Sequence, residues 1–336
     1  MTASTRVPLS VLDLATVREG HGSSDALHGT IEIARAADEL GFARFWVAEH
    51  HNMPAVASTS PPVLISAVAA HTRDIRVGSG GVMLPNHVPF VVAEQFALLE
   101  ALYPGRIDLG IGRAPGTDQA TAAALRGGSP QLAVEQFPEH LRTLLGLLGD
   151  ARVPAGKLSA TPAPETFPEV WMLGSSTYGA QIAAALGLPF CYAYHFAMNS
   201  DVDGALRIYR DGFQPSPRCP RPWAMVSVSA LAAETTEEAH FLAGPSRMMA
   251  LSLRTGRLGP MISPQTAAQR DLSEMDHAVL ETLPGTQVIG TEAEVVDALD
   301  ALVERTGADE LMLAGSVYAP ETRVDSLSRI AKEWLR

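Results

Sequence analysis

Short apolar runs alternate with amphipathic stretches along the whole 336-residue chain. The apolar runs read as buried strands, and they cover residues 8–14, 42–48, 75–84, 107–112, 170–173, 189–196, 223–233 and 309–314. Helical spacing of apolar residues between them predicts helices over 28–40, 62–71, 90–102, 132–148, 180–186, 202–213, 236–243, 291–306 and 324–335. Eight strands that alternate with helices favour an α/β fold of the (β/α)8 TIM barrel type. A doubly wound sheet is the alternative, but it needs fewer strands and would leave two of these unaccounted for.

Two long segments interrupt this alternation. Residues 113–129 are rich in Gly, Ala, Thr and Pro, which predicts a long loop with short helical pieces. Residues 244–287 are Met-rich and then polar, without a clean strand, and the next helix opens at Thr291 with Glu294 in capping-box spacing. We therefore expect one domain over residues 1–336, with inserted loops at the C-terminal face of the barrel and with 244–287 as a mobile insertion or lid.

The composition narrows the function classes. Hydrophobic residues make up 46% of the chain, enough for a large core, and the formal net charge is −12. Such an acidic chain lacks a basic footprint, so we expect no nucleic acid and no membrane as a partner. The chain has no run of the roughly 18 apolar residues that a membrane helix needs. Cys191 and Cys219 lack zinc-like spacing and fit reduced thiols, and residues 1–6 lack the apolar core of a signal peptide, so we expect a cytoplasmic protein.

A polar cluster, Glu49-His50-His51-Asn52, directly follows the buried run Phe45–Ala48. In α/β barrels and sheets, ligands bind at this carboxyl end of the strands. Adjacent histidines on an extended backbone point in different directions, so at most one is expected to face the centre of a pocket. That histidine could act as a general base near neutral pH, or it could be a hydrogen-bonded structural residue. A metal site is less favoured, because no matching group of ligands follows the other strands.

Two glycine-rich stretches allow more than one interpretation. Gly78-Ser-Gly-Gly81 lies inside an otherwise β-rich run, where glycine marks either close approach of a flat ligand to the backbone or crowding inside the barrel. The stretch Gly110-Ile-Gly112-Arg-Ala-Pro-Gly116 has the wrong spacing for a dinucleotide fingerprint, and Pro115 with a long loop follows it rather than a helix.

Two further strand ends predict an anion site. Arg113 comes directly after a buried run, and the planar fork of an arginine suits phosphate. The stretch from Gly174 to Ala180, which includes Ser175, Ser176 and Tyr178, joins another strand to an Ala-rich helix. Hydroxyls and backbone N–H groups at a helix N-terminus bind anions, although a serine there also serves as an ordinary N-cap. Arg113 and this loop together suggest one phosphate contacted from two sides.

Taken together, four motifs resemble a known family. They are Ala-Glu-His-His-Asn at 48–52, Val-Gly-Ser-Gly-Gly-Val-Met-Leu-Pro-Asn-His at 77–87, Leu-Tyr-Pro-Gly-Arg-Ile-Asp-Leu-Gly-Ile-Gly-Arg-Ala-Pro-Gly at 102–116 and Leu-Gly-Ser-Ser at 173–176. The chain resembles the bacterial luciferase-like family of flavin-dependent monooxygenases over nearly its whole length, and it is most similar to the single-chain FMN-type branch.

This resemblance implies a (β/α)8 barrel, usually dimeric, that binds reduced FMN at its C-terminal face. It implies that His50 is the catalytic histidine and that a non-prolyl cis peptide near the flavin ring lies at Gly80–Gly81. It further implies that Arg113 holds the flavin phosphate together with the hydroxyl-rich loop of Ser175, Ser176 and Tyr178. Two family features are missing: Gly112 stands where luciferase has a reactive cysteine, and a second phosphate-binding arginine has no counterpart near Gln131.

The function expected from the resemblance is a monooxygenase that uses FMNH2 and O2. Oxygen would add to the flavin C4a, and the resulting (hydro)peroxide would oxygenate a small organic substrate, in secondary-metabolite tailoring or on a simpler aldehyde or sulfonate. The chain has no recognisable nicotinamide site, so a separate flavin reductase is expected to supply FMNH2. Two alternatives stay open: hydride transfer with the deazaflavin F420 on the same fold, and flavin binding without catalysis.

Overall fold

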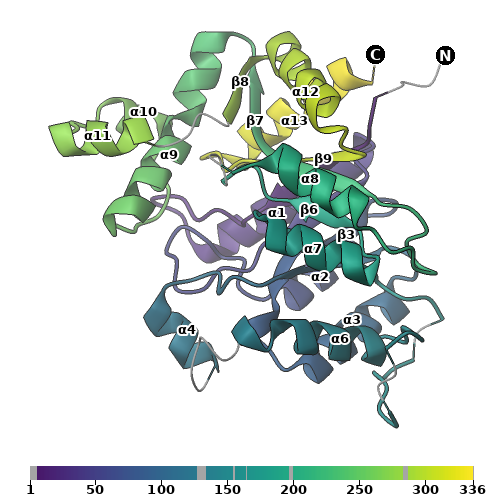
Figure 1. Ribbon diagram of the computed structural model, residues 1–336. Helices are drawn as coiled ribbons and strands as arrows, with labels where there is room; N and C mark the ends of the chain where they lie inside the picture. Colours follow the sequence, from purple (N-terminus) through teal and green to yellow (C-terminus); the bar gives the residue numbers. More distant parts are fainter. Residues whose placement is uncertain are drawn as a thin grey trace.

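Eight parallel strands close into a barrel (Figure 1) within the described part of the computed structural model, which comprises residues 6–126, 134–153, 156–163, 165–196, 200–282 and 287–335. The strands are β1 (Leu9–Asp13), β2 (Arg44–Val47), β3 (Arg76–Met83), β4 (Ile107–Gly112), β5 (Glu169–Gly174), β6 (Phe190–Tyr192), β7 (Ala224–Ala233) and β9 (Glu310–Ala314). Strands β1 to β7 pair in order, and β9 closes the ring between β7 and β1. The predicted (β/α)8 barrel is confirmed.

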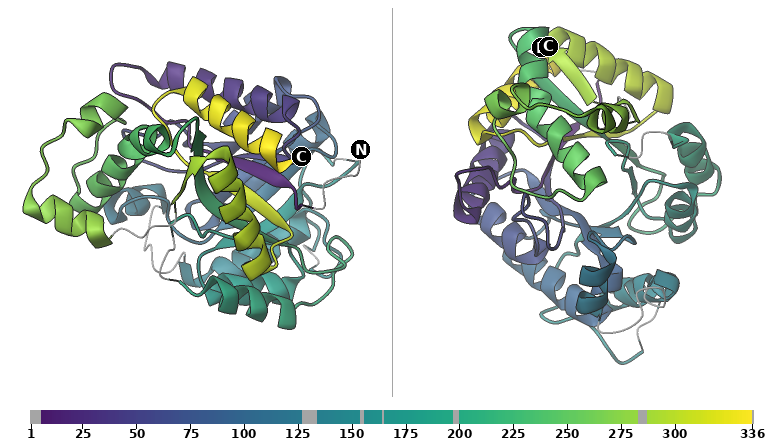
Figure 2. Two further views of the ribbon diagram at one scale, coloured as in Figure 1. Left: turned by 90° about the horizontal axis from the view of Figure 1, so that it is seen from above. Right: turned by 90° about the vertical axis from the view of Figure 1, so that its left-hand side faces the viewer.

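Helices pack around the outside of the barrel (Figure 2). They are α1 (Ser23–Glu39), α2 (Pro61–Ala70), α3 (Pro89–Leu102), α6 (Phe137–Leu147), α7 (Thr177–Leu186), α8 (Val202–Asp211), α12 (Glu292–Thr306) and α13 (Pro320–Trp334). The predicted capping box is confirmed at α12, where Thr291 accepts from the Glu294 backbone N–H and Glu294 accepts from the Thr291 backbone N–H. Part of the helix predicted over 132–148 lies outside the described residues, and α6 begins at Phe137.

The segment after β7 differs from the prediction in two ways. The helix predicted to end at Ala243 continues through Pro245, as α9 (Thr236–Thr255), and α10 (Pro264–Ala268) and α11 (Glu274–Thr282) follow it. Helix α9 persists because Met248 and Leu251 bury their side chains against Leu280 of α11 and its neighbours. A further strand, β8 (Gln287–Thr291), was not predicted, because it is a short run that pairs only with the far half of β7, outside the ring.

The insertions and the chain termini lie on opposite sides of the molecule. Helix α4 (Gln119–Arg126) follows β4, and α9 to α11 follow β7, so both segments extend from the carboxyl ends of barrel strands. In Figure 1 they lie together at the left, whereas the two termini lie at the right. The inserted segments are therefore at the C-terminal face, as predicted, and that face is the one on which barrel enzymes bind their ligands.

Large side chains fill the inside of the barrel, so the barrel has no open channel at its centre. The middle layer is apolar and includes Trp46, Trp171, Met225 and Met312, and the rings of Trp46 and Trp171 meet edge to face with centroids 5.3 Å apart. Below it, toward the amino ends of the strands, Arg44 bonds three carboxylates at 2.8–3.1 Å; they belong to Asp108, Glu169 and Glu310. This closed floor leaves the carboxyl-end mouth as the place for a ligand.

Glycine at position 110 is a requirement of this packing. A Cβ at Gly110 would overlap the backbone oxygen of Ser79 on β3 and would lie 2.7 Å from Leu173 Cδ1. We expect Gly110→Ala to lower the free energy of unfolding by about 3 kcal/mol, at the upper end of the usual cost of overpacking. Urea denaturation measures this loss. Gly259→Ala is the control, because no atom lies within 4 Å of that Cβ, and equal stability of the two variants would contradict the prediction.

Candidate active site

Glu49 organises the mouth of the barrel at the end of β2. Its side chain is fully buried, and it accepts hydrogen bonds from His51 Nε2 at 2.9 Å, from His87 Nε2 at 2.9 Å and from the Met83 backbone N–H at 3.0 Å. Burial raises the pKa of Glu49, but the contacts with His87, His51 and Met83 outweigh burial and hold that pKa below its usual value. The carboxylate therefore stays charged and ties the loop after β2 to the loop after β3.

His50 is arranged differently from its neighbour His51. Its backbone N–H donates to Ser58 O at 3.0 Å, and its Nδ1 lies 3.2 Å from the Gly116 carbonyl oxygen. Since a carbonyl only accepts, Nδ1 carries the proton and Nε2 keeps its lone pair. Burial lowers the pKa of His50, and the bond to Gly116 and the charge of Glu49 oppose this only in part. His50 is thus an uncharged ring with a basic nitrogen, whereas His51 is held by Glu49.

The Gly80–Gly81 peptide is cis, as the resemblance predicted. A Cβ at Gly80 would lie 2.6 Å from Leu12 Cδ1, and one at Gly81 would lie 2.7 Å from the Gly110 backbone oxygen. Crowding inside the barrel is therefore enough to explain why these two positions are glycine. The other interpretation, close approach of a ligand to this backbone, stays a prediction.

The Arg113 side chain lies against Tyr178 at the start of α7. This is the arrangement expected if both contact one anion. Its guanidinium carbon lies 4.1 Å from the centre of the Tyr178 ring, because β4 and β5 are neighbours and both segments follow their ends. Among the described residues, no carboxylate lies within 4 Å of the Arg113 side chain. A half-buried arginine held by an aromatic ring, without a carboxylate, keeps its charge available for an anion.

The Ser176 hydroxyl does not cap helix α7. Ser176 is the N-cap residue of α7, yet its side chain makes no capping hydrogen bond. Ser175 is half-buried, and its carbonyl accepts from Tyr192 Oη at 3.2 Å. The alternative of ordinary N-capping is therefore wrong for Ser176, and the first N–H groups of α7 stand beside Arg113 and Tyr178. The position near Gln131, where the family has a second phosphate-binding arginine, lies outside the described residues.

His195 is a further residue at the mouth that no sequence motif marks. It falls inside the strand predicted over 189–196, but β6 ends at Tyr192, so His195 lies in the loop after it. Its Nδ1 lies 2.6 Å from Ser227 Oγ of β7, and burial, with a smaller contribution from His50, lowers its pKa. The available signal was its position: like His50, it stands three residues beyond the last residue of its strand.

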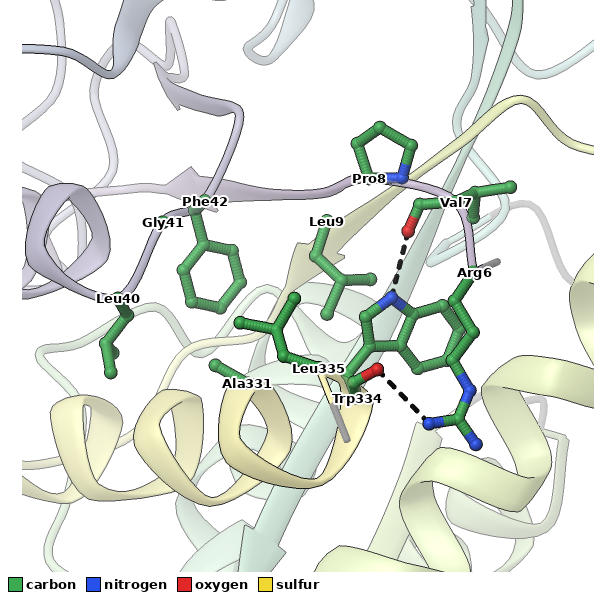
Figure 3. A pocket seen from close by; sticks show the side chains of 10 residues that line it. All are labelled: Arg6, Val7, Pro8, Leu9, Leu40, Gly41, Phe42, Ala331, Trp334 and Leu335. Atoms are coloured by element: carbon green, nitrogen blue, oxygen red, sulfur yellow. Dashed lines mark hydrogen bonds between the residues drawn. The ribbon is translucent and has the colours of Figure 1, made fainter. Parts of the chain in front are cut away.

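A pocket elsewhere in the molecule contains none of these residues. It is lined by Leu9, Phe42 and Trp334 among others, and it lies at the amino ends of β1 and β2 beside the last turn of α13 (Figure 3). Trp334 Nε1 donates to Val7 O at 2.9 Å, so this pocket is a seam between the first strand and the last helix. Arg113, Tyr178, His50 and His195 follow the carboxyl ends of their strands, at the opposite end of the barrel.

Comparison with known proteins identifies the family of the chain. Residues 7–310 match the model of the luciferase-like monooxygenase family. A luciferase-like monooxygenase of Escherichia coli (strain K12) is 40% identical over 326 residues, which cover 97% of this chain and 96% of the relative. An N-acetyl-S-alkylcysteine monooxygenase of Bacillus subtilis (strain 168) is 44% identical over 191 residues, which cover 56% of this chain and 57% of the relative.

Solved structures agree with this placement. Apo-MsnO8 superposes with a TM-score of 0.89 at 36% identity and covers 98% of this chain and 99% of its own. Two distant structures share the fold, each with a TM-score of 0.68: the oxygenating constituent of 3,6-diketocamphane monooxygenase from Pseudomonas putida in complex with FMN, at 18% identity, and an F420-dependent secondary alcohol dehydrogenase, at 16%. They cover 98% and 99% of this chain and 98% and 100% of their own. The chain belongs to the luciferase-like monooxygenase family.

Proposed function

We propose that this protein is an FMN-dependent monooxygenase that uses FMNH2 and O2 to oxygenate a small organic substrate. The observation that carries the proposal is the group formed by Arg113, Tyr178 and the N-terminus of α7, because an arginine beside a helix N-terminus supports phosphate binding. It lies at the same barrel mouth as His50, whose ring is uncharged and keeps a basic Nε2.

The residues present fit FMN. Arg113, the Ser175 and Ser176 hydroxyls and the first N–H groups of α7 would hold its phosphate with charge-assisted hydrogen bonds. The backbone at Gly80–Gly81 would lie beside the flat ring system. When bound, reduced FMN would supply the two electrons with which one oxygen atom of O2 becomes water while the other enters the substrate.

The other residues of the mouth would act on the substrate. His50 Nε2 would accept a proton from the substrate or orient it, because the Gly116 carbonyl fixes the proton on Nδ1. Glu49 would position this loop through His51, His87 and Met83. We further propose that α9 to α11 form a lid: Met248 and Leu251 pack on Leu280, and Arg257 pairs with Asp276, so the segment can move as a unit. Hydrogen exchange across α9 to α11 that is unchanged by FMN and substrate would exclude the lid.

Consumption of O2 separates this proposal from hydride transfer with F420, which needs no oxygen. With FMNH2 from a separate reductase, we expect O2 uptake that depends on the organic substrate and yields an oxygenated product. A panel with a thioether, an alkene and a ketone covers the common substrates of such chemistry. Labelling with 18O2 must place one labelled oxygen in the product. Substrate turnover without O2, or flavin binding without any turnover, would establish one of the two alternatives instead.

We propose a homodimer that uses the neighbouring helices α2 and α3. Both carry exposed apolar side chains on their outer faces: Val63 is 71% exposed, and Val91, Leu98 and Leu102 are 48–57% exposed. An apolar patch of this kind marks an interface in many proteins. A chain that stays monomeric in sedimentation at micromolar concentration would exclude the dimer.

We also propose a transient flavin reductase partner and a cytoplasmic location. Both cysteines are buried free thiols, which suits a reducing compartment. The described residues contain no helix that is long and apolar enough to cross a membrane. A nicotinamide-driven turnover of the purified chain alone would exclude the reductase, and a secreted chain in a fractionation of cells would exclude the location.

A further inference from the structure

His195 and His50 follow strands on opposite sides of the barrel. Around the ring, β6 lies four strands from β2 in either direction, so the two strands are diametrically opposed. Each histidine follows the end of its strand by three residues. Both residues therefore stand at the carboxyl-end mouth of the barrel, on opposite walls.

Ser227 sets the orientation of the His195 ring. Met225 lies in the apolar layer inside the barrel, and alternation along β7 places Ser227 on the same inner side, one layer nearer the mouth. We assign the single hydrogen of Ser227 Oγ to its hydrogen bond with the Tyr192 carbonyl oxygen at 3.2 Å, because a carbonyl can only accept, and the 2.6 Å contact with His195 Nδ1 then uses a hydrogen on the ring. His195 is then an Nδ1–H tautomer with a lone pair on Nε2.

The surroundings of His195 keep the ring uncharged. Burial lowers the pKa of His195 to about 4, with a smaller contribution from His50. Phe196 lies edge to face with the ring, with centroids 4.6 Å apart. Among the described residues, His195 Nε2 has no hydrogen-bond partner. An uncharged imidazole with a free Nε2 can only accept a hydrogen bond there.

We propose that His195 is a second substrate-binding residue, whose Nε2 accepts a hydrogen bond from an O–H or N–H group of the substrate. The inference rests on the proposed function in one respect, namely that the organic substrate enters this mouth. Ser227 is a positioning residue, because it acts on the substrate only through the tautomer of His195. The substrate class is thereby narrowed to organic molecules that carry a hydrogen-bond donor beside the group that is oxidised.

The first test is the tautomer of His195 by NMR. Two-bond 15N–1H spectra of the histidine-labelled enzyme are recorded at pH 7, without and with oxidised FMN, and His195→Phe identifies the signals. We expect Nδ1–H with an unprotonated Nε2. Ser227→Ala should shift the tautomer toward Nε2–H, and Ser227→Thr should restore the wild-type form. A proton on Nε2 in the wild type, or a charged ring at pH 7, would overturn the proposal.

The second test uses two matched aryl thioethers, 4-(methylthio)phenol and 4-methoxythioanisole, which differ in the O–H donor. In the FMN-loaded enzyme, we expect the phenol to shift the His195 Nε2 resonance and the methyl ether to leave it in place. Equal shifts, or no shift with either compound, would overturn the proposal. The measurement needs no turnover, so it separates this inference from the monooxygenase activity, which the uptake of O2 decides independently.

Steady-state kinetics then test whether His195 affects substrate binding rather than the chemical step. For the donor-bearing compound, His195→Phe should raise KM roughly threefold to tenfold, as expected for one lost hydrogen bond, with a smaller change in kcat. The methyl ether should show no such change. His28→Phe, at an exposed position on α1, is the matched control. An equal rise of KM for both compounds would assign His195 to general packing.

Discussion

Replacing His50 with alanine is expected to abolish most turnover while FMN binding stays unchanged. His50 Nε2 is the basic nitrogen that the loop after β2 presents to the mouth, because the Gly116 carbonyl holds the proton on Nδ1. A positioned general base typically contributes about 10²–10⁴-fold to the rate, so kcat should fall by about that factor. Single-turnover product formation measures kcat, and a flavin fluorescence titration measures the Kd for FMN.

Two comparisons make this result specific. His51→Gln should instead lower stability, because His51 donates to the buried carboxylate of Glu49. His28→Ala changes an exposed histidine on α1 and should leave both quantities at the wild-type level. Unchanged turnover of His50→Ala would remove His50 from the mechanism, and a parallel loss of FMN affinity would make it a cofactor-binding residue.

Replacing Arg113 with alanine is expected to weaken FMN binding by about 2–3 kcal/mol, which is roughly 30- to 150-fold in Kd. The guanidinium stacks on Tyr178 beside the N-terminus of α7, and within the described part of the chain no carboxylate competes for it. The lost binding free energy should come from the contact with the FMN phosphate alone. Riboflavin, which lacks the phosphate, should bind the wild type more weakly than FMN, and it should bind Arg113→Ala and the wild type about equally.

The controls for Arg113 address charge and geometry separately. Arg113→Lys keeps the charge but loses the planar fork, so its affinity should lie between those of the wild type and the alanine variant. Arg142→Ala removes an exposed arginine on α6 and should have no effect on the Kd. Equal affinity of the wild-type protein for FMN and riboflavin would refute the phosphate assignment.

Most of the barrel could be predicted from the sequence because its strands are buried on both faces. Runs such as Phe45–Ala48 and Ile107–Gly112 are short and mostly apolar, and segments with helical periodicity separate them, so the local pattern identifies them. The prediction failed where tertiary contacts override local signals. Helix α9 continues through Pro245 because its Met248 and Leu251 pack on α11, and β8 exists only because β7 is long enough to extend beyond the ring.

Most residues of the candidate site were predictable from the sequence, but the contacts between them were not. Motifs identify residues at strand ends, which share one face of a barrel whatever the details of packing. Sequence motifs do not show which side chains contact each other. That Arg113 stacks on Tyr178, that the Ser176 side chain makes no capping bond and that His195 contacts Ser227 all depend on how neighbouring strands end.

The sequence alone predicts a (β/α)8 barrel and places a Glu-His-His-Asn cluster at the end of a buried strand. It also carries the motifs that resemble luciferase-like proteins. The tertiary structure separates the surroundings of the two adjacent histidines. Glu49 binds His51, whereas His50 lies against the Gly116 carbonyl oxygen, and a further histidine, His195, follows the strand on the opposite wall. Adjacent residues carry the same local signal, so only the folded barrel, in which residues 50 and 195 follow opposed strands, distinguishes their surroundings.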